Sequence, residues 1–285
     1  MIKNHKNFLS NAFSFLVNRF KNKMIETYSS VKYIRRKVMG RVLITGAFTG
    51  IGLAASRLFL ERGWTVVMVG RDVREDIFTD LKTRYHDDVY SFVCDVTKDL
   101  EVNYLHDYVM KNLKGLDVII NNAGIITHGY LHQTSEEDWD AIMNTDVKSI
   151  YLTSKYFIPE MIKNKSGKIV NTASISGLAA DYKMPVYNAA KGAVVNLTRA
   201  MALDYGEYGI RVNSVCPGAT DTPMLKRGSI PYEEFARVNP LKRICEPEEI
   251  AKAMYFLSTD ESSYCNGVNL PVTGGLEVHT GQPKG

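Results

Sequence analysis

The segment RVLITGAFTGIG, residues 41–52, decides the fold of this 285-residue chain. It joins a short β-branched run to a glycine-rich turn that opens an amphipathic segment. Gly46, Gly50 and Gly52 remove side chains where a backbone turns tightly, approaches a ligand and packs a helix on a strand. Free N–H groups at the start of that helix would bind an anion such as a pyrophosphate. A simple turn between a strand and a helix is the alternative interpretation.

Six further β-branched runs follow, and most of the longer segments between them are typical of helices. The runs are TVVMV (65–69), VYSFVCD (89–95), DVIINNAG (117–124), GKIVNTAS (167–174), IRVNSVCPG (210–218) and GVNLPVTGG (267–275). Near-continuous apolar strands separated by helices indicate a parallel sheet covered on both faces. We therefore predict a Rossmann-type, doubly wound α/β fold that binds its ligand beyond the carboxyl ends of the strands. No linker divides residues 40–285, which we predict to be one domain.

The basic charge of the chain is concentrated in its first 39 residues. They contain nine Lys or Arg and one acid, whereas the remaining residues contain 26 Lys or Arg and 30 Asp or Glu. A body without basic excess argues against nucleic-acid binding. The four cysteines form no C-x-x-C pair, which predicts reduced thiols in the cytoplasm and neither a disulfide framework nor a zinc ribbon.

Residues 1–39 form a basic N-terminal extension with apolar side chains at helical spacing. These are Phe8, Leu9, Ala12, Phe13, Leu16 and Phe20. The stripe is too interrupted for an integral membrane segment, but it is typical of a mitochondrial presequence or a helix on a membrane surface. A third interpretation is that the protein starts at Met39, because the ordered pattern begins at Gly40.

The segment VYNAAKGAVVNLTRAMALDYG, residues 186–206, is predicted to be a buried helix. It places Tyr187 and Lys191 four residues apart on one face, so the ammonium can alter the acidity of the phenol. Ser174 precedes Tyr187 by thirteen residues. Tyr-x-x-x-Lys alone is common, and plain packing of the ring is the alternative for this pair. No G-x-S-x-G surrounds Ser174, which argues against a serine hydrolase.

Four motifs in this order resemble the short-chain dehydrogenase/reductase family, in particular its 3-oxoacyl-ACP reductase-like and alcohol dehydrogenase members. They are the glycine turn at 46–52, NNAG at 121–124, Ser174 with YNAAK at 187–191, and the Pro-Gly loop at 217–224. The resemblance covers residues 41 to about 275. It implies an NAD(P)-dependent oxidoreductase that interconverts an alcohol and a carbonyl compound.

The resemblance also implies the roles of the site residues. Tyr187 is expected to be the general acid/base, favoured as a phenolate by Lys191. Lys191 is also expected to hold the nicotinamide ribose, and Ser174 to donate a hydrogen bond to the substrate oxygen. The expected cofactor contacts are Gly46, Thr49, Gly50, Ile51, Gly52, Arg71, Asp95, Val96, Asn122, Tyr187, Lys191, Thr220 and Thr222.

The choice of cofactor depends on the residues that end the second strand. A carboxylate there would bind a ribose 2′-hydroxyl and repel a 2′-phosphate, but this chain has Gly70 and Arg71. NADP is therefore preferred and NAD stays possible, because the glycine turn lacks the second basic residue of many NADP-binding members.

Two positions depart from the family pattern. Asp146 occupies a position where the family commonly has an Asn that supports a water relay to the catalytic lysine. Asp146 is counted with the catalytic residues because its backbone carbonyl could fill that role. Its carboxylate could also raise the pKa of Lys191. Thr273 stands where an Asp is usual, a departure that concerns the last strand.

Several other classes of function compete with this prediction. A catalytically weak NAD(P)-binding regulator of the same fold stays the alternative. A family-related dehalogenase would need an Arg at Lys191, and a nucleotide-sugar epimerase would need a longer C-terminal region. His128 and His132 have no third ligand, so no metal is predicted. A small-molecule alcohol or carbonyl substrate and, by resemblance, a homotetramer are the expected partners.

Overall fold

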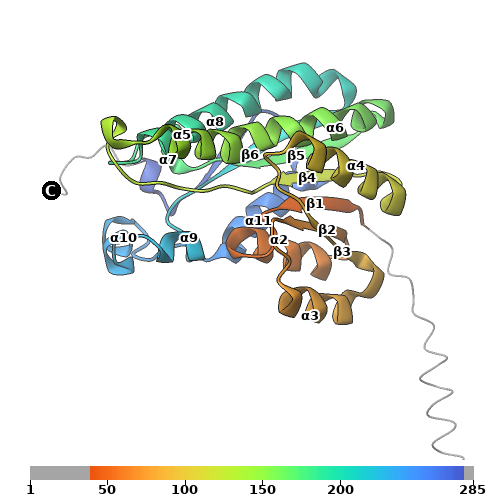
Figure 1. Cartoon of the computed structure of the whole chain (residues 1–285), viewed down its shortest axis with the longest axis horizontal. Helices are drawn as coiled ribbons and strands as arrows, with labels where there is room; N and C mark the ends of the chain where they lie inside the picture. Colours follow the sequence, from red (N-terminus) through yellow and green to blue (C-terminus); the bar gives the residue numbers. More distant parts are fainter. Residues whose placement is uncertain (1–38, 279–285) are drawn as a thin grey trace, which may run out of the picture. The chain divides into compact units, whose positions relative to one another are not determined.

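Parallel strands form one sheet across residues 39–278, the part of the chain that this computed structural model describes (Figure 1). The sheet has seven strands in the order β3-β2-β1-β4-β5-β6-β7. The strands are β1 (Arg41–Thr45), β2 (Thr65–Gly70), β3 (Val89–Val93), β4 (Val118–Asn121), β5 (Gly167–Thr172), β6 (Ile210–Pro217) and β7 (Asn269–Val272). This order reverses direction beside β1, and such a switch point is where doubly wound sheets bind ligands.

All seven predicted strand segments are confirmed. β1 matches its predicted segment and β2 extends one residue further, whereas β3 to β7 are shorter because the chain leaves the ladder before each motif ends. β4, for instance, ends at Asn121, so most of the NNAG motif forms a loop beyond the sheet. The prediction of a Rossmann-type parallel sheet in a single domain is confirmed.

Helices cover both faces of the sheet (Figure 1). One face carries α2 (Gly50–Glu61), α3 (Glu75–Tyr85) and α11 (Pro247–Ser258), and the other carries α4 (Asp99–Leu113), α6 (Ser149–Asn164) and α8 (Pro185–Tyr205). Shorter elements in the described residues are α5 (Glu136–Ile142), α7 (Ile175–Leu178), α9 (Pro223–Lys226), α10 (Tyr232–Val238) and the π-helix η3 (Met143–Lys148). The 3-10 helices are η1 (His86–Asp88), η2 (Leu131–Gln133), η4 (Gly206–Tyr208), η5 (Asp260–Ser262) and η6 (Leu276–Val278).

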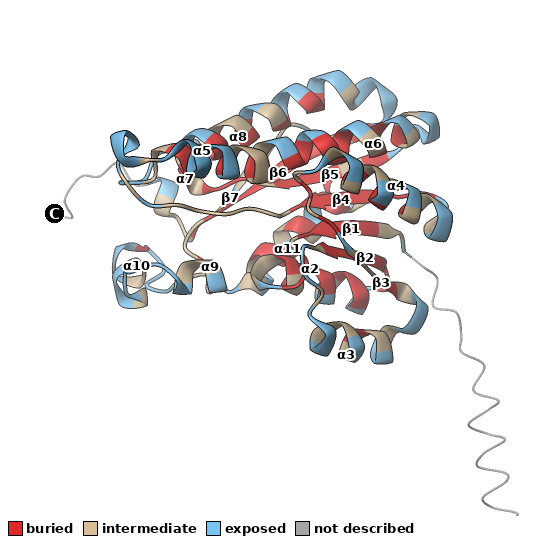
Figure 2. Ribbon diagram, viewed as in Figure 1, coloured by how far each residue is buried: buried red, intermediate tan, exposed pale blue. Residues whose placement is uncertain are grey.

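The apolar core has two halves, one on each face of the sheet. Successive residues of a strand point to opposite faces, so Leu43 enters the half under α4 and α6 while Ile44 enters the half under α2 and α11. Figure 2 shows the central strands buried between the two helical layers. This packing fixes the carboxyl ends of the strands along one edge, where the site is built.

Helix α8 is 21 residues long and begins with Pro185, a residue that fits the first turn of a helix. Tyr187 and Lys191 lie on its buried face together with Ala190 and Val194. A lysine on that face is unusual because a buried ammonium must find a partner. Plain packing therefore does not explain this pair.

The predicted N-terminal extension lies outside the described residues, except for Met39. Within residues 39–278, no helix is long and apolar enough to cross a bilayer. The four cysteines are free thiols, as predicted. The predicted cytoplasmic location, with its mitochondrial and membrane-surface alternatives, stays a prediction.

Candidate active site

The glycine-rich turn follows β1 and is closed to larger side chains. Gly46 and Gly50 have φ angles of +63° and +49°, a region that favours glycine. A Cβ on Gly52 would lie 2.2 Å from the carbonyl oxygen of Gly46. Thr49 precedes α2 without capping it through its side chain, and the first turn of α2 has no acidic residue. The turn therefore leaves backbone N–H groups available for an anion, and it fits the pyrophosphate of a dinucleotide.

Hydrogen bonds from the NNAG motif fix this turn. The backbone N–H groups of Asn122 and Ala123 donate to Thr45 Oγ1 over 2.9 and 3.0 Å. Asn122 Nδ2 donates to the carbonyl oxygen of Thr45 over 3.0 Å. The side chain of Asn122, predicted as a cofactor contact, thus also shapes the glycine turn from the neighbouring strand.

The ends of β2 and β3 bring Arg71 close to Asp95. Arg71 is exposed, and its charge acts on the Asp95 carboxylate. Burial alone raises the pKa of Asp95, but hydrogen bonds from Thr97 together with nearby basic charges hold it below its usual value. Val96, the other predicted adenine contact, is buried beside them.

Phe48 excludes a carboxylate from the end of β2. A Cβ on Gly70 would lie 2.9 Å from the ring of Phe48. An aspartate at position 70 would therefore collide with the glycine turn of the same site. This contact explains why the position is glycine, and it leaves Arg71 as the first side chain beyond the strand.

Ser174, Tyr187 and Lys191 are brought together beside the carboxyl end of β5. Ser174 caps α7 by accepting a hydrogen bond from the N–H of Ser176 over 3.1 Å. Lys191 Nζ lies 5.5 Å from the centroid of the Tyr187 ring. These three side chains and Asp146, the fourth predicted catalytic residue, are all at least nine-tenths buried.

Gly177 sets the distance between the serine and the other two residues. A Cβ on Gly177 would lie 2.5 Å from the carbonyl oxygen of Lys191, so α7 touches α8 backbone to backbone. The serine and the tyrosine are therefore positioned by contact between two helices rather than by flexible side chains.

Asp146 forms an ion pair with Lys191. Its Oδ2 lies 3.0 Å from Lys191 Nζ, and both side chains are almost fully buried. Its Oδ1 accepts the backbone N–H of Ile125 over 2.8 Å, and Lys191 Nζ donates to the carbonyl oxygen of Thr172 over 2.9 Å. Asp146 lies in the π-helix η3, a type of helix that often marks functional sites.

The charges of this cluster oppose one another. Burial raises the pKa of Tyr187, Lys191 lowers it, and Asp146 raises it again, so that the net shift is upward. Burial lowers the pKa of Lys191, but Asp146 and Tyr187 outweigh burial and keep it raised. The expected effect of Lys191 on the pKa of the phenol is present, but burial and Asp146 outweigh it. The expectation that Asp146 raises the pKa of Lys191 agrees with this result.

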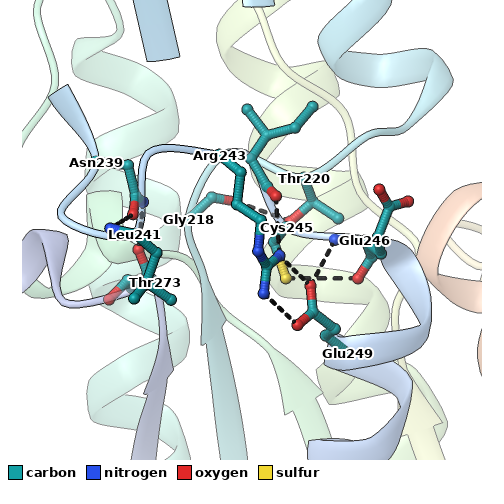
Figure 3. A network of polar contacts seen from close by, with 10 residues as sticks. Gly218, Thr220, Asn239, Leu241, Arg243, Cys245, Glu246, Glu249 and Thr273 are labelled. Atoms are coloured by element: carbon teal, nitrogen blue, oxygen red, sulfur yellow. Dashed lines mark hydrogen bonds and ion pairs between the residues drawn. The ribbon is translucent and has the colours of Figure 1, made fainter. Parts of the chain in front are cut away.

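A polar network holds the Pro-Gly loop after β6 (Figure 3). The N–H of Cys245 donates to the carbonyl oxygen of Ala219 over 2.9 Å, and Thr220 forms a β-bridge with Cys245. Arg243 binds both carboxylate oxygens of Glu249, over 2.6 and 2.8 Å, and holds the pKa of Glu249 down to about 2. The start of α11 therefore anchors the loop that carries the predicted cofactor contacts.

The same loop closes on the glycine turn. Thr222 caps α9, and its methyl carbon would lie 3.1 Å from a Cβ on Gly50. Thr222 and Gly50, both predicted cofactor contacts from distant parts of the sequence, are thus neighbours. Helices α9 and α10, which follow, contain no buried residue.

Thr273, the second departure from the family pattern, lies directly after β7. Asn239 Nδ2 donates to the carbonyl oxygen of Thr273 over 2.7 Å, and the Thr273 hydroxyl donates to the Glu277 carboxylate. A hollow nearby is lined by Leu241, Arg243, Thr273 and Glu277 among others, and Ser174, Tyr187 and Lys191 are not among its lining residues. It is separate from the catalytic cluster.

Sequence reasoning missed four polar residues of the site. They are Thr45 at the end of β1, Asn171 in β5, Ser176 in α7 and Asp181 in the loop after α7. Asn171 accepts a hydrogen bond from Asn121 and donates to Thr198, linking β4, β5 and α8. Thr45 and Asn171 could have been found from the sequence, because each is a polar residue within an otherwise apolar strand.

Similarity to known proteins identifies the family of this chain. The family model described as "Enoyl-(Acyl carrier protein) reductase" matches residues 46–277. The chain belongs to the short-chain dehydrogenase/reductase family. It is 42% identical over 248 residues to meso-2,3-butanediol dehydrogenase of Serratia marcescens, covering 85% of this chain and 96% of that protein.

Solved structures of the family agree with the fold and the cofactor class. The structure of ElxO with NADP bound has a TM-score of 0.80 and 30% identity, covering 84% of this chain and 99% of that one. That of 3-ketoacyl-(acyl-carrier-protein) reductase from Brucella melitensis, complexed with NADH, has a TM-score of 0.79 and 28% identity over 84% and 99%. The protein is thus an NAD(P)-dependent oxidoreductase acting on CH–OH groups, and the regulatory alternative gains no support.

The buried carboxylate of this family member gives a testable pH effect. Asp146→Asn keeps an oxygen for the N–H of Ile125 but removes the negative charge that raises the pKa of Tyr187. The pH midpoint of kcat/KM for alcohol oxidation should fall by about one unit. Asp140→Asn, an exposed acid of α5, is the control and should leave the midpoint unchanged. A shift to higher pH would mean that Lys191 loses its proton without Asp146, and would contradict the prediction.

Proposed function

We propose that Tyr187 is the general acid/base of this oxidoreductase, with Ser174 and Lys191 as its partners. The observation that carries the proposal is the buried cluster of these three side chains beside the carboxyl end of β5. In alcohol oxidation the phenolate would accept the hydroxyl proton, and in carbonyl reduction the phenol would return it. When bound, the nicotinamide accepts or supplies the hydride.

The chain's own residues position the reacting groups and adjust their charge. Ser174 orients the substrate oxygen beside Tyr187. Lys191, held by Asp146 and Thr172, supplies the positive charge that favours the phenolate. The same ammonium would hold the nicotinamide ribose, and the pyrophosphate would bind at the glycine turn and the start of α2. Residues 40–285 form the catalytic domain in this proposal.

We infer that the substrate is a small neutral secondary alcohol, with a vicinal diol as the first candidate. The similarity to a butanediol dehydrogenase, covering 96% of that protein, supports this class. The charge of Asp181 acts on Tyr187, so a carboxylate lies near the reacting oxygen. It would disfavour anionic substrates such as acyl-phosphopantetheine thioesters. The loop 174–184 and the segment 220–235, with α9 and α10, would close over the substrate.

A substrate panel with a matched variant tests this proposal. Wild-type protein is mixed with meso-2,3-butanediol, 2-butanol or a 3-oxoacyl thioester, with each cofactor, and followed at the nicotinamide absorbance. The diol should give the largest kcat/KM. Tyr187→Phe should lower kcat by roughly 10²–10⁴-fold because it removes the general acid/base.

Tyr205→Phe, at the far end of α8, is the control and should keep the wild-type rate. Absence of turnover by the wild type despite tight cofactor binding would overturn the enzymatic proposal. A Tyr187→Phe variant as active as Tyr205→Phe would overturn the role of Tyr187.

We also propose a preference for NADP, with NAD as a slower cofactor. Arg71 is the exposed basic side chain at the end of β2, and Phe48 excludes a carboxylate from position 70. Arg71→Ala should lower kcat/KM for NADPH about 10- to 100-fold through loss of charge-assisted hydrogen bonds to the 2′-phosphate, and leave NADH nearly unchanged. Arg74→Ala, an exposed arginine paired with Asp76, is the control. Equal use of both cofactors by wild type and Arg71→Ala would exclude the preference.

A homo-oligomer, of four subunits by family resemblance, completes the proposal. Leu100 and Tyr104 are exposed on one face of α4, and Tyr151 is exposed on α6. Asp99 joins the two helices by binding Lys155 and Tyr156, so these apolar side chains lie on neighbouring elements. Light scattering should give a mass near four chains, and a monomer's mass would exclude the assembly.

A further inference from the structure

A row of four polar side chains crosses the apolar core near the carboxyl ends of β4 and β5. Thr153 Oγ1, from α6, donates to Asn121 Oδ1 over 2.8 Å. Asn121 and Asn171 lie opposite each other in β4 and β5, and Asn121 Nδ2 donates to Asn171 Oδ1 over 2.9 Å. Asn171 Nδ2 donates to Thr198 Oγ1, on α8, over 3.0 Å. All four residues are at most 4% exposed, so the row joins two strands and two helices inside the protein.

The end of the row on α8 has a fixed direction. The Thr198 hydroxyl donates its single proton to the carbonyl oxygen of Val194 over 2.8 Å, and its oxygen accepts from Asn171. Asn171 is fully buried. Removing the Thr198 hydroxyl would therefore leave the Asn171 amide without this acceptor in an apolar environment, where an unpaired polar group is costly.

The surroundings of the row are apolar, which makes the row decisive for the position of α8. Ile169, Val194 and Met201 are among the side chains of this half of the core. Apolar contacts have no direction, so they tolerate small rotations and translations of a helix. Buried hydrogen bonds require one geometry, and breaking one leaves an unpaired group. The row therefore fixes the rotation of α8 and its height along β5.

The position of α8 determines which group Lys191 reaches. Thr198 follows Lys191 by seven residues, close to two helical turns, and both lie on the buried face of α8. Asn171 directly precedes Thr172, whose carbonyl oxygen accepts from Lys191 Nζ over 2.9 Å. Adjacent residues of β5 thus hold two points on one face of α8. A shift of α8 that breaks the bond at Thr198 would also move Lys191 away from Thr172.

We propose that Asn171 and Thr198 are positioning residues for the reaction, an inference that rests on the proposed role of Tyr187. They act through α8. By fixing this helix on β5, they place Tyr187 and Lys191 relative to Ser174. A helix that is free to shift would present the phenol to the substrate oxygen in the wrong geometry for much of the time.

The glycine turn is held by a separate set of hydrogen bonds. Asn122 donates to Thr45 through its backbone N–H and through its side chain. These bonds do not involve Asn171 or Thr198. Loss of the bond between Asn171 and Thr198 should therefore slow the chemical step and leave cofactor binding nearly unchanged.

A graded series at position 198 tests this proposal with the alcohol that the panel turns over fastest. Thr198→Val keeps the shape of the side chain but removes the hydroxyl. It should lower kcat roughly 10- to 100-fold, because a displacement of about 1 Å can cost 10²-fold in rate. KM for the alcohol and the Kd of NADPH, measured by fluorescence titration, should change less than about 3-fold, since an effect confined to kcat indicates lost transition-state stabilisation.

Two further variants keep all or part of the hydrogen bond. Thr198→Ser retains the hydroxyl and should keep the wild-type kcat. Thr198→Cys retains only a weak acceptor and should give an intermediate kcat. It also carries the test where the valine variant does not fold.

Ser258→Ala is the matched control. The Ser258 hydroxyl is fully buried and donates to the carbonyl oxygen of Met254 within α11, on the other face of the sheet. Its removal deletes a buried hydroxyl without touching α8. This variant should keep the wild-type kcat, with each rate corrected for the folded fraction from urea unfolding.

Wild-type kcat in Thr198→Val, or in Thr198→Cys where the valine variant does not fold, would overturn the proposal. An equal loss of kcat in Ser258→Ala would also overturn it, because the effect would then belong to lost stability and not to the position of α8. The role of Tyr187 is decided separately by Tyr187→Phe against Tyr205→Phe, so the two failures are distinguishable.

Discussion

The ion pair between Lys191 and Asp146 is the interaction on which the reacting centre depends. An ammonium in the interior is stable only when a partner offsets the cost of removing it from water, and losing that partner costs about 3–5 kcal/mol. Here the partner is a full carboxylate 3.0 Å away, carried by a π-helix and held by the N–H of Ile125. The same negative charge that stabilises the Lys191 ammonium also raises the pKa of the Tyr187 phenol. Stabilising the lysine and lowering the pKa of the tyrosine are therefore opposing requirements, and in this chain the first prevails.

Short polar side chains at strand ends transmit the geometry of the sheet to the site. Thr45 fixes NNAG against the glycine turn, and the Asn121–Asn171–Thr198 series joins β4 and β5 to α8. Each of these groups is buried and paired, as buried polar groups need to be. The result is a site whose parts follow six of the strands and are tied to the sheet by these hydrogen bonds.

Much of this arrangement was predictable from the sequence. The β-branched runs marked every strand because a parallel sheet buried on both faces requires continuous apolar segments. The glycine turn could be recognised because its backbone geometry excludes most side chains. The Tyr187–Lys191 pair could be recognised because the helix period places both residues on one face. The departure at Asp146 is also visible in the sequence. Its net effect on the pKa of Tyr187 is not, since burial and two opposing charges act on the phenol at once.

The remaining features depend on contacts between distant segments. Asp181 looks like an ordinary loop residue, and its hydrogen bonds with Asn188 form only once the loop after α7 packs on α8. The collision between Phe48 and position 70 likewise joins two turns 22 residues apart. No local pattern encodes such contacts, because they are set by how the sheet brings its strand ends together.

The glycine at position 177 affects how the substrate specificity of such a protein can change. Because α7 meets α8 backbone to backbone, the spacing of Ser174 and Tyr187 is independent of the side chains in the loop that follows. Residues of that loop other than Asp181 can therefore be exchanged to accept a new substrate while the chemistry stays unchanged. A library confined to residues 179–184, with Asp181 kept, would explore specificity on a constant catalytic frame.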